Sequence, residues 1–452
     1  MGELADTLLE SWRASVPSSA REHDRQGTLT PHTLGRIREL GLLGLTIPER
    51  FGGAGAGLDE VIPLLRGIAR SDRAVAMTLG LHMGPGTRLL VAHGSADQHA
   101  RFLPPIAEGR CLTAFGATEP AAGSDLSSIQ ATATLDGDHL VLSGEKLYVT
   151  NGSWAGLLTV FVRTPELGGL RATAMVLLTP EDGYTVGAEE HKLGLRGSST
   201  TPIHLDGVRV PVSRLLGEPA TGQKMFERAM CWGRTVLAGA SLGVFDAVCA
   251  AALEHTAHRR QGGRTLAQLP VVQEKLARLL ARKAVLERLV DRVVHADDDA
   301  LPLLSLAAKV AASEAAWEAA DEALQLHGAA GFMESTDLPL LLRDARPARI
   351  FEGANDVLLC RAGLAVVMDP SQAGPWSGPL ADTWKRTHGL QLVRDTRKLL
   401  RLGRVWLEEQ LSAGLDPEDP HTALWNAERD ARLAPHLCAE PDPALLAAVL
   451  AG

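Results

Sequence analysis

The hydrophobic periodicity of this chain changes twice, and this order of elements restricts the fold more than any other feature of the sequence. From about residue 3 to 109 apolar residues recur at helical spacing, and over about 112–212 they alternate as in β-strands. The helical period then returns over about 221–260, 267–296 and 302–327. Because helices and strands are segregated along the chain, the sequence predicts an α+β fold and not the alternating elements of a Rossmann sheet.

Local signals support this order. Thr30 stands before Pro31 at the start of a helical pattern, where it is suited to be an N-cap. The segment TATLDGDHLVLSG alternates around Asp136-Gly137, which predicts a β-hairpin. The segments ATAMVLL and TPIHLDGVRV predict further strands of the same domain.

The chain has 452 residues, of which 45% are apolar and 22% charged, so it is expected to fold into several domains with large cores. We predict an N-terminal helical domain, a central β domain, a C-terminal four-helix bundle and a linker with a helical extension, over residues 1–110, 111–212, 213–368 and 369–452. The linker is the Pro/Gly-rich stretch DPSQAGPWSGP, and the tail beyond the last predicted helix, 382–411, is expected to be loosely ordered.

Charge and cysteine usage exclude several classes of partner. The formal net charge is -9 and no Lys/Arg run is dense enough to neutralise a row of phosphates, so nucleic acid is not expected as a partner. Five scattered cysteines without a CxxC pair indicate reduced thiols and a cytoplasmic location. His255 and His258 lie three apart without a third ligand, which favours a solvated helix face over a metal site. The acidic N-terminus lacks a targeting pattern, and no uninterrupted apolar run reaches the roughly 18 residues of a transmembrane segment.

Two polar motifs in the β domain could bind a ligand. FGATEPAAGSD carries Thr118 and Ser124 among small residues, so it offers hydroxyls and exposed backbone N–H groups, although an ordinary Ser/Thr-rich turn has the same composition. LSGEKLYVTNGS places Tyr148 and Thr150 two apart on a predicted strand, where an aromatic plane beside a hydroxyl suits a flat ring system. A half-buried strand would also explain that pair.

A third motif, RIFEGAND, carries one carboxylate. Glu352 stands between Phe351 and Gly353 after an apolar helical segment. It could be a catalytic group or a carboxylate near a helix N-terminus, where acidic residues are favoured.

Together these motifs resemble the acyl-CoA dehydrogenase family of flavoproteins. The resemblance runs in order from about Leu42 to Ala362, through GLLGLTIPERFGGAG, TEPAAGSD, KLYVTNGS, LGLRGSSTTPIHLDGVRVP, AHRRQGGRTLAQLPVVQEKLA, ALQLHGAAGF and RDARPARIFEGAND. It implies FAD bound between the β domain and the helical bundle, which would account for a flavoprotein without a GxGxxG fingerprint.

The resemblance assigns cofactor contacts residue by residue. Thr118 and Ser124 match positions that contact the flavin ring, with Ser124 also close to the substrate's pantetheine, and Tyr148 and Thr150 match positions along the isoalloxazine. Further contacts fall late in the chain. Arg259 matches the arginine that meets the FAD pyrophosphate, usually of a neighbouring subunit, and Gln325 with Gly328 matches the QxxGG element near the adenosine. A subunit interface is therefore implied.

The same resemblance makes Glu352 the general base of an α,β-dehydrogenation. The base removes the α-proton while a hydride leaves the β-carbon for flavin N5, and the backbone N–H of the base residue helps to polarise the thioester carbonyl. Arg234 and Gly353 are expected to contact the substrate. Desolvation by Phe351, the flavin and the acyl chain would lift the pKa of Glu352 toward neutrality.

Position 233 tests whether another base competes. In relatives that keep the base on the bundle's first helix it precedes an arginine; here Gly233 precedes Arg234, so Glu352 has no rival. The WGR and IFEGAND stretches are most similar to the very-long-chain branch, which also has a C-terminal helical extension. There the extension occupies the space of a second dimer, so a homodimer is favoured over a homotetramer.

Four departures weaken expected cofactor contacts without removing the base: Gly262 for a phenylalanine, Ala329 for the second glycine of QxxGG, Ala354 for a threonine, and Asp356 for Glu or Gln. The leading hypothesis is an FAD-dependent dehydrogenase that converts acyl-CoA to trans-2-enoyl-CoA and passes electrons to an electron-transfer flavoprotein. The alternatives are the same reaction on an acyl-carrier-protein thioester, an acyl-CoA oxidase, and a flavin-binding homologue that has lost turnover.

Overall fold

The structure, a computed structural model, describes residues 2–16, 19–369, 371, 374, 377–416 and 418–437. These residues form two compact units. The larger unit comprises Met1–Leu276 and Leu286–Ala354, and the smaller comprises Ala277–Val285 and Asn355–Gly452. All of the predicted cofactor, substrate and catalytic residues lie in the larger unit.

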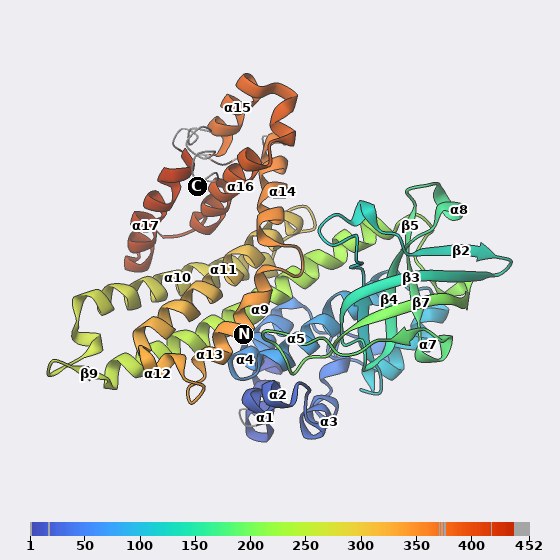
Figure 1. Cartoon of the computed structure of the whole chain (residues 1–452), viewed down its shortest axis with the longest axis horizontal. Helices are drawn as coiled ribbons and strands as arrows, with labels where there is room; N and C mark the ends of the chain where they lie inside the picture. The colour runs from blue at the N-terminus through green and yellow to red at the C-terminus, as the bar shows by residue number, and fades with distance from the viewer. Residues whose placement is uncertain are drawn as a thin grey trace, which may run out of the picture. The chain divides into compact units, whose positions relative to one another are not determined.

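Short helices make up the N-terminal part of the larger unit (Figure 1). They are α1 (Glu3–Ser15), α2 (Ala20–Gln26), α3 (Pro31–Glu39), α4 (Leu58–Ser71), α5 (Arg73–Leu81), the π-helical turn η3 (His82–Gly86), α6 (Thr87–His93) and α7 (Ala96–Ala107). The predicted N-cap is confirmed, because the Thr30 side chain accepts a hydrogen bond from the backbone N–H of Thr33. The buried His23 side chain then joins these helices through Asp72, 2.7 Å away.

The central part is one mixed β-sheet. Its strands are β1 (Leu112–Gly116), β2 (Thr132–Asp136), β3 (His139–Thr150), β4 (Ala155–Arg163), β5 (Thr173–Leu178), β6 (Thr185–Val186), β7 (Thr200–Pro211) and β8 (Leu215–Leu216). They follow the order β6-β7-β3-β2-β4-β5-β8, with β1 paired to β4. The predicted hairpin is confirmed: Asp136 pairs with His139 across a turn in which Gly137 has φ 62.

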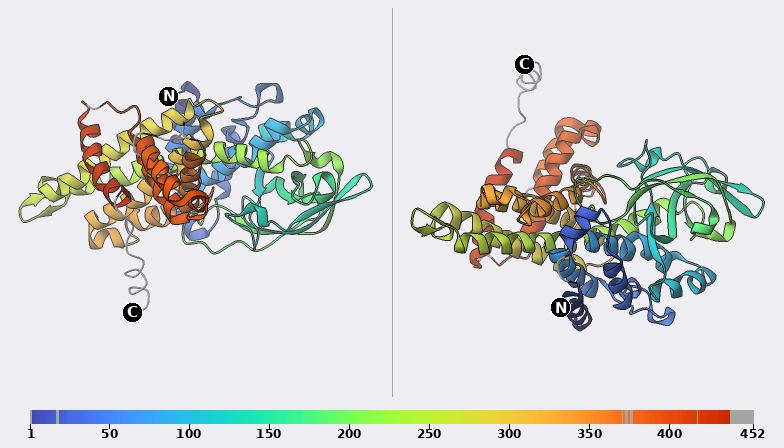
Figure 2. Two further views of the ribbon diagram at one scale, coloured as in Figure 1. Left: turned by 90° about the horizontal axis from the view of Figure 1, so that it is seen from above. Right: turned by 60° about the horizontal axis from the view of Figure 1, so that its bottom comes forward.

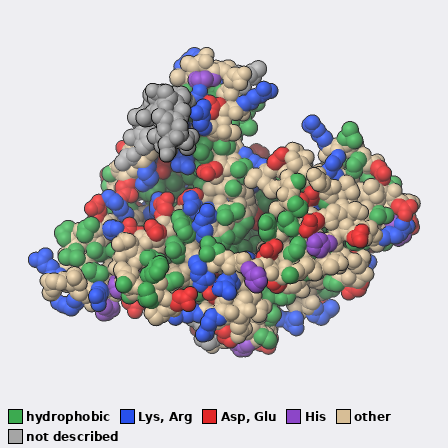
Figure 3. All heavy atoms as spheres, in the orientation of Figure 1, with side chains coloured by type: hydrophobic (Ala, Val, Ile, Leu, Met, Phe, Trp, Pro, Cys, Tyr) green, Lys and Arg blue, Asp and Glu red, His purple; other side chains and the backbone are tan. Residues whose placement is uncertain are grey.

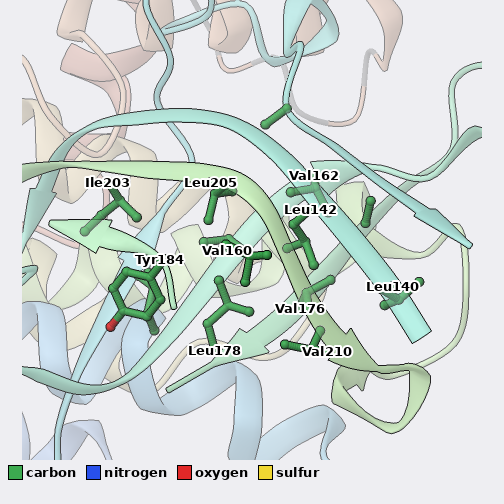
Figure 4. Packing of buried hydrophobic residues seen from close by; sticks show 14 of the residues in the cluster. Leu140, Leu142, Val160, Val162, Val176, Leu178, Tyr184, Ile203, Leu205 and Val210 are labelled. Atoms are coloured by element: carbon green, nitrogen blue, oxygen red, sulfur yellow. The ribbon is translucent and has the colours of Figure 1, made fainter. Parts of the chain in front are cut away.

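Apolar side chains cover both faces of the sheet at β4 and β5, which are buried almost continuously, whereas β3 and β7 largely alternate buried and exposed residues as the sequence predicts. One cluster includes Leu142, Val160, Val176 and Leu205 from four different strands (Figure 4). A second cluster packs the sheet against α6, α7 and the start of α9 (Gly222–His258), through Leu90, Leu103 and Met230 among others. The sheet is therefore held against helices on one side, which places its loops next to the bundle.

A buried ion pair ties the two polar motifs of the β domain together. Lys146 on β3 donates to the carboxylate of Glu119, and both side chains are at most 5% exposed. The same carboxylate accepts a hydrogen bond of 3.1 Å from the backbone N–H of Ala131. Glu119 thus closes the loop that carries Thr118 and fastens it to the strand that carries Tyr148.

Long helices form the C-terminal part of the chain, close to their predicted ranges: α9, α10 (Pro270–Val294) and α11 (Leu301–His327), followed by α12 (Ala329–Phe332) and α13 (Leu338–Ala345). The sequence has no uninterrupted apolar run of roughly 18 residues, but α9 is long and apolar enough on average to cross a membrane by length and composition. However, 72% of its most apolar window is buried inside the fold, as in the core helix of a compact domain.

The smaller unit contains α14 (Asn355–Met368), α15 (Ser377–His388), α16 (Thr396–Ser412) and α17 (Pro420–Leu437). Helices α14 and α16 pack backbone to backbone, because a Cβ on Gly363 or Gly403 would collide with a carbonyl oxygen of the facing helix. The prediction of a loosely ordered tail is wrong for residues 420–437, where a helix buries Trp425. Residues 438–452, with Cys438, and parts of the predicted linker lie outside the described residues.

We expect the substitution Lys146→Met to lower the free energy of unfolding by about 3 kcal/mol, because it leaves the buried Glu119 carboxylate without its cation. The matched control is Arg209→Met, which removes an ion pair to Asp136 whose side chains are both exposed. That control should change the stability by less than about 1 kcal/mol. Denaturant unfolding of the three proteins measures both values, and equal stabilities would contradict the anchoring role of Lys146.

Candidate active site

Glu352 lies in an irregular turn between the 3-10 turn η8 (Arg346–Arg349) and α14. Its backbone has φ 57 and that of the following Gly353 has φ 97, so two successive residues are left-handed. A left-handed conformation costs a non-glycine residue roughly 1–2 kcal/mol and persists only where its surroundings hold it. The position of Glu352 is therefore set by its neighbours and not by local preference.

Two buried cations hold this turn. Arg234 Nε on α9 donates to the Glu352 carbonyl oxygen at 3.1 Å, and Lys309 Nζ on α11 donates to the Gly353 carbonyl oxygen at 2.7 Å. The side chains of Arg234 and Lys309 are 8% and 0% exposed. Consecutive carbonyl groups of the strained turn are thus bonded to two different helices of the bundle.

The Glu352 carboxylate is not a helix cap. Its Oε2 atom is buried and has no hydrogen-bond partner among the described residues. A capping carboxylate would accept a backbone N–H from the first turn of α14, whose first residue is Asn355. The carboxylate instead lies against α9, where a Cβ placed on Gly233 would be 2.8 Å from Oε2. A side chain at position 233 would displace it.

Burial raises the pKa of Glu352 to about 7, against the opposing charges of Arg234 and Lys309. Burial likewise lowers the pKa of Lys309 to about 7, against the opposing charge of Glu352. A carboxylate with a pKa near neutrality is ionised in part of the molecules at physiological pH and binds a proton well, which suits a general base.

The π-helical turn η3 packs against α9 beside this carboxylate. Its Gly84 lies next to α9, so that a Cβ added there would be 3.6 Å from Gly233 Cα. Two facing glycines leave the backbone of both elements close together. In the same turn, His82 Nδ1 lies 2.9 Å from Thr113 Oγ1 of strand β1, and this hydrogen bond links the β domain to η3.

The predicted flavin-ring residues of the β domain are brought together in part. The backbone N–H of Leu147 donates to the Thr118 carbonyl at 2.8 Å, where a bulge interrupts the pairing of β3. In that bulge Tyr148 has φ 55 and is 61% exposed, and the partly buried Thr150 ends the strand. The next residue, Asn151, bonds the Thr78 carbonyl of α5 at 3.0 Å, which fixes this edge of the sheet to the helices around Glu352. Ser124 is exposed in the loop before η4 (Leu126–Ser128).

The other predicted cofactor residues lie at the far end of the bundle. Arg259 caps α9, the exposed Gln325 lies in the last turn of α11, and Gly328 follows that helix with φ 59. Arg259 lies 26 residues beyond Gly233, so at 1.5 Å per residue it is roughly 39 Å away along the helix. Figures 1 and 2 show the sheet and the hairpin of β9 (Arg260–Gln261) at opposite ends of the larger unit. One chain does not bring the two sets of residues together.

The expectation of a solvated face at His255 and His258 is wrong in part. His258 is exposed, but His255 stacks on His327 with 3.9 Å between ring centroids, which joins the ends of α9 and α11.

A cavity of about 930 Å³ is lined by charged and apolar side chains of α1, α4, α9 and α10 and by none of the predicted site residues. Acidic and basic side chains are interspersed on the face seen in Figure 3.

Family models match along most of the chain. The acyl-CoA dehydrogenase N-terminal, middle and C-terminal domains match residues 2–110, 114–208 and 220–365. The chain belongs to the acyl-CoA dehydrogenase family. A relative from Bacillus subtilis, an acyl-CoA dehydrogenase, is 34% identical over 320 residues, which are 70% of this chain and 84% of that protein.

The very-long-chain branch and a solved structure are also similar. The mitochondrial very-long-chain specific acyl-CoA dehydrogenase of Rattus norvegicus is 35% identical over 397 residues, which are 85% of this chain. The match spans 61% of the rat protein's length. The structure of butyryl-CoA dehydrogenase from Megasphaera elsdenii is 29% identical with a TM-score of 0.77, over 81% of this chain and 99% of that one. The predicted family and fold class are therefore confirmed.

Sequence reasoning missed three charged residues that support this site, namely Lys309 and the pair of Glu119 and Lys146. Lys309 is the one charged residue between Leu301 and Ser313, and that isolation within an Ala/Leu-rich helical face was the available signal. The pairing of Glu119 with Lys146 had no comparable signal, because 27 residues separate the partners.

We expect Glu352 to titrate with a midpoint near pH 7, because burial disfavours its carboxylate. The infrared band of a protonated carboxylic acid, taken as the difference between the wild type and Glu352→Gln, should disappear as the pH rises through that value. Below it the group is mostly protonated, and above it mostly ionised. A midpoint near the ordinary value of 4.5 would contradict the buried environment.

Proposed function

We propose that this protein catalyses the FAD-dependent α,β-dehydrogenation of an acyl thioester, from acyl-CoA to trans-2-enoyl-CoA, with Glu352 as the base. The observation that carries the proposal is the buried Glu352 Oε2, which has no partner among the described residues and belongs to a group whose pKa burial raises to about 7. A buried carboxylate oxygen without a hydrogen-bond partner breaks no hydrogen bond when it takes a proton from carbon.

The β domain fits a flavin. The Tyr148 ring is 61% exposed, which is unusual for a large aromatic side chain unless a ligand or partner covers it. The hydroxyl groups of Thr118 and Thr150 make no hydrogen bonds among the described residues, so they remain available to a polar ring system. FAD, when bound, supplies the hydride acceptor. Thr118, Tyr148 and Thr150 would hold and orient its ring.

The chain's own groups account for the proton transfer. The backbone N–H of Glu352 makes no hydrogen bond to any described residue, so it can donate to the thioester carbonyl oxygen and acidify the α-carbon. The carboxylate of the same residue then removes the α-proton. Arg234 holds the Glu352 carbonyl, and we assign it to the site as the residue that keeps donor and base in one orientation.

We expect Glu352→Gln to retain FAD but to reduce it with an acyl thioester at least about 10²-fold more slowly, because the amide cannot act as a base. Anaerobic bleaching of the flavin by acyl-CoAs of increasing chain length measures the rate. The same acyl chains attached to acyl carrier protein show whether a carrier-protein thioester is the preferred substrate. Formation of peroxide in air identifies an oxidase. Bleaching of Glu352→Gln at the wild-type rate would overturn the assignment of the base, and absence of flavin from the wild type would favour a homologue without turnover.

We further propose a homodimer whose FAD sites are shared between two copies. Support comes from the separation of roughly 39 Å along α9 between Gly233, which lies against the Glu352 carboxylate, and Arg259, because it exceeds the reach of one FAD within one chain. Exposed apolar side chains near that far end, among them Val271 and Phe332, are 59% and 73% exposed and would be covered by a partner. Arg259 of one copy would then meet the pyrophosphate of the FAD held by the other.

The remaining assignments are proposals of the same kind. An electron-transfer flavoprotein is the proposed electron acceptor. A cytoplasmic location is supported by the described cysteines Cys111, Cys231, Cys249 and Cys360, none of which forms a disulfide.

We expect Arg259→Ala to weaken FAD binding roughly tenfold to a hundredfold, because a charge-assisted hydrogen bond to phosphate contributes about 1.5–3 kcal/mol. Flavin retained after dialysis, and its dissociation constant from fluorescence, provide the measurement. Arg264→Ala on the same exposed hairpin is the matched control and should retain FAD as the wild type does. Equal flavin content in all three proteins would remove Arg259 from the cofactor site.

A further inference from the structure

Lys309 is a buried cation that no part of the proposed reaction uses. It lies in the middle of α11 among fully buried alanines and valines, and its side chain is 0% exposed. Removing an ammonium group from water costs several kcal/mol unless hydrogen bonds and charges compensate. Lys309 regains part of this energy at one defined place, because its Nζ atom donates a hydrogen bond of 2.7 Å to the carbonyl oxygen of Gly353, next to the proposed base.

We propose that Lys309 is a positioning residue for Glu352, which holds the left-handed Glu352–Gly353 turn through the Gly353 carbonyl and favours the carboxylate form of Glu352 by its charge. The effect on turnover rests on the proposed function. The inference has a mechanical part, the hydrogen bond that holds the turn, and an electrostatic part, the effect of the Lys309 charge on Glu352, and both rest on contacts of the described residues alone.

The mechanical part follows from the backbone. Without a donor from α11, the partly buried Gly353 carbonyl would lose its hydrogen bond to a charged group, which is stronger than a bond between neutral groups. The energy of such a bond is comparable to the strain of the non-glycine left-handed residue beside it. Arg234 holds the preceding carbonyl, so loss of Lys309 would remove the bond that fastens Gly353 to α11 and would let the carboxylate turn away from Gly233.

The electrostatic part follows from the groups that face Lys309. These are Glu352 in the turn, Arg234 on α9, Glu314 on α11 and Arg349 on η8. Arg349 and Glu314 form an ion pair of 2.8 Å, so they largely compensate each other. Arg234 and Lys309 remain as the two cations that lower the pKa of Glu352 against its burial. Removal of the Lys309 charge therefore moves the pKa of Glu352 upward.

The test separates the two parts with two substitutions. Lys309→Gln removes the charge but keeps an N–H donor for the Gly353 carbonyl, whereas Lys309→Met removes both. The matched control is Lys192→Met, which removes another partly buried lysine, bonded to Thr200 Oγ1 at 2.9 Å, that has no charge interaction with Glu352. The infrared midpoint of Glu352 is measured first in each purified protein, without a thioester.

We expect the Glu352 midpoint to rise by about one pH unit in both Lys309 variants and to stay at the wild-type value in Lys192→Met. Unchanged midpoints in folded Lys309 variants would overturn the electrostatic part. If Lys309→Met is recovered unfolded, Lys309→Gln decides this question by itself. Because no substrate is present, the result is independent of the proposed reaction.

Flavin reduction at saturating thioester, above the midpoint of each variant, tests the mechanical part. We expect Lys309→Met to be at least about tenfold slower than Lys309→Gln, since a displaced base loses its alignment with the α-proton. KM should change less than kcat, because the lysine does not touch the substrate. Equal rates in the two variants would overturn the role of the Gly353 carbonyl. A wild type that no thioester reduces would instead refute the proposed function and leave the midpoint result standing.

Discussion

The active site depends on one strained turn that two buried cations hold. Glu352 and Gly353 adopt left-handed backbone conformations, and their carbonyl groups are bonded to Arg234 and Lys309 on separate helices of the bundle. The turn gains a fixed orientation from these bonds, and the carboxylate gains a dry position against Gly233. Packing of α9 against α11 is therefore required to place the Glu352 carboxylate as well as to bury the core.

Burial and charge act in opposite directions on this carboxylate. Desolvation alone would keep Glu352 protonated, and two nearby cations alone would keep it ionised. The balance leaves the pKa of Glu352 at about 7, which allows it both to accept and to release a proton near neutrality. In the β domain the buried Glu119–Lys146 pair has a different role, because Glu119 also accepts backbone N–H groups and so fixes a loop.

Much of the architecture could be predicted from hydrophobic period and turn residues. The three long helices, the hairpin at Asp136-Gly137 and the cap at Thr30 follow from local patterns that depend on a few neighbouring residues. The prediction of a loosely ordered tail was wrong for residues 420–437 because prolines and aspartates there resemble a loop, whereas Pro420 begins α17. The stacking of His255 was missed for another reason: its neighbour His327 lies 72 residues away in the sequence.

The sequence by itself determined the family and the order of the domains, because seven motifs in register are visible along the chain, and the same resemblance predicted Glu352 as the base. It could not decide between a catalytic Glu352 and a helix cap from local pattern alone. Only the tertiary structure shows that Oε2 is buried without a partner, that Lys309 reaches the neighbouring carbonyl, and that Arg259 lies at the other end of α9. Each of these facts depends on which segments, distant in the sequence, are close in space. Burial, charge interactions and the distance that a cofactor can span are set by positions in space and not by positions along the chain.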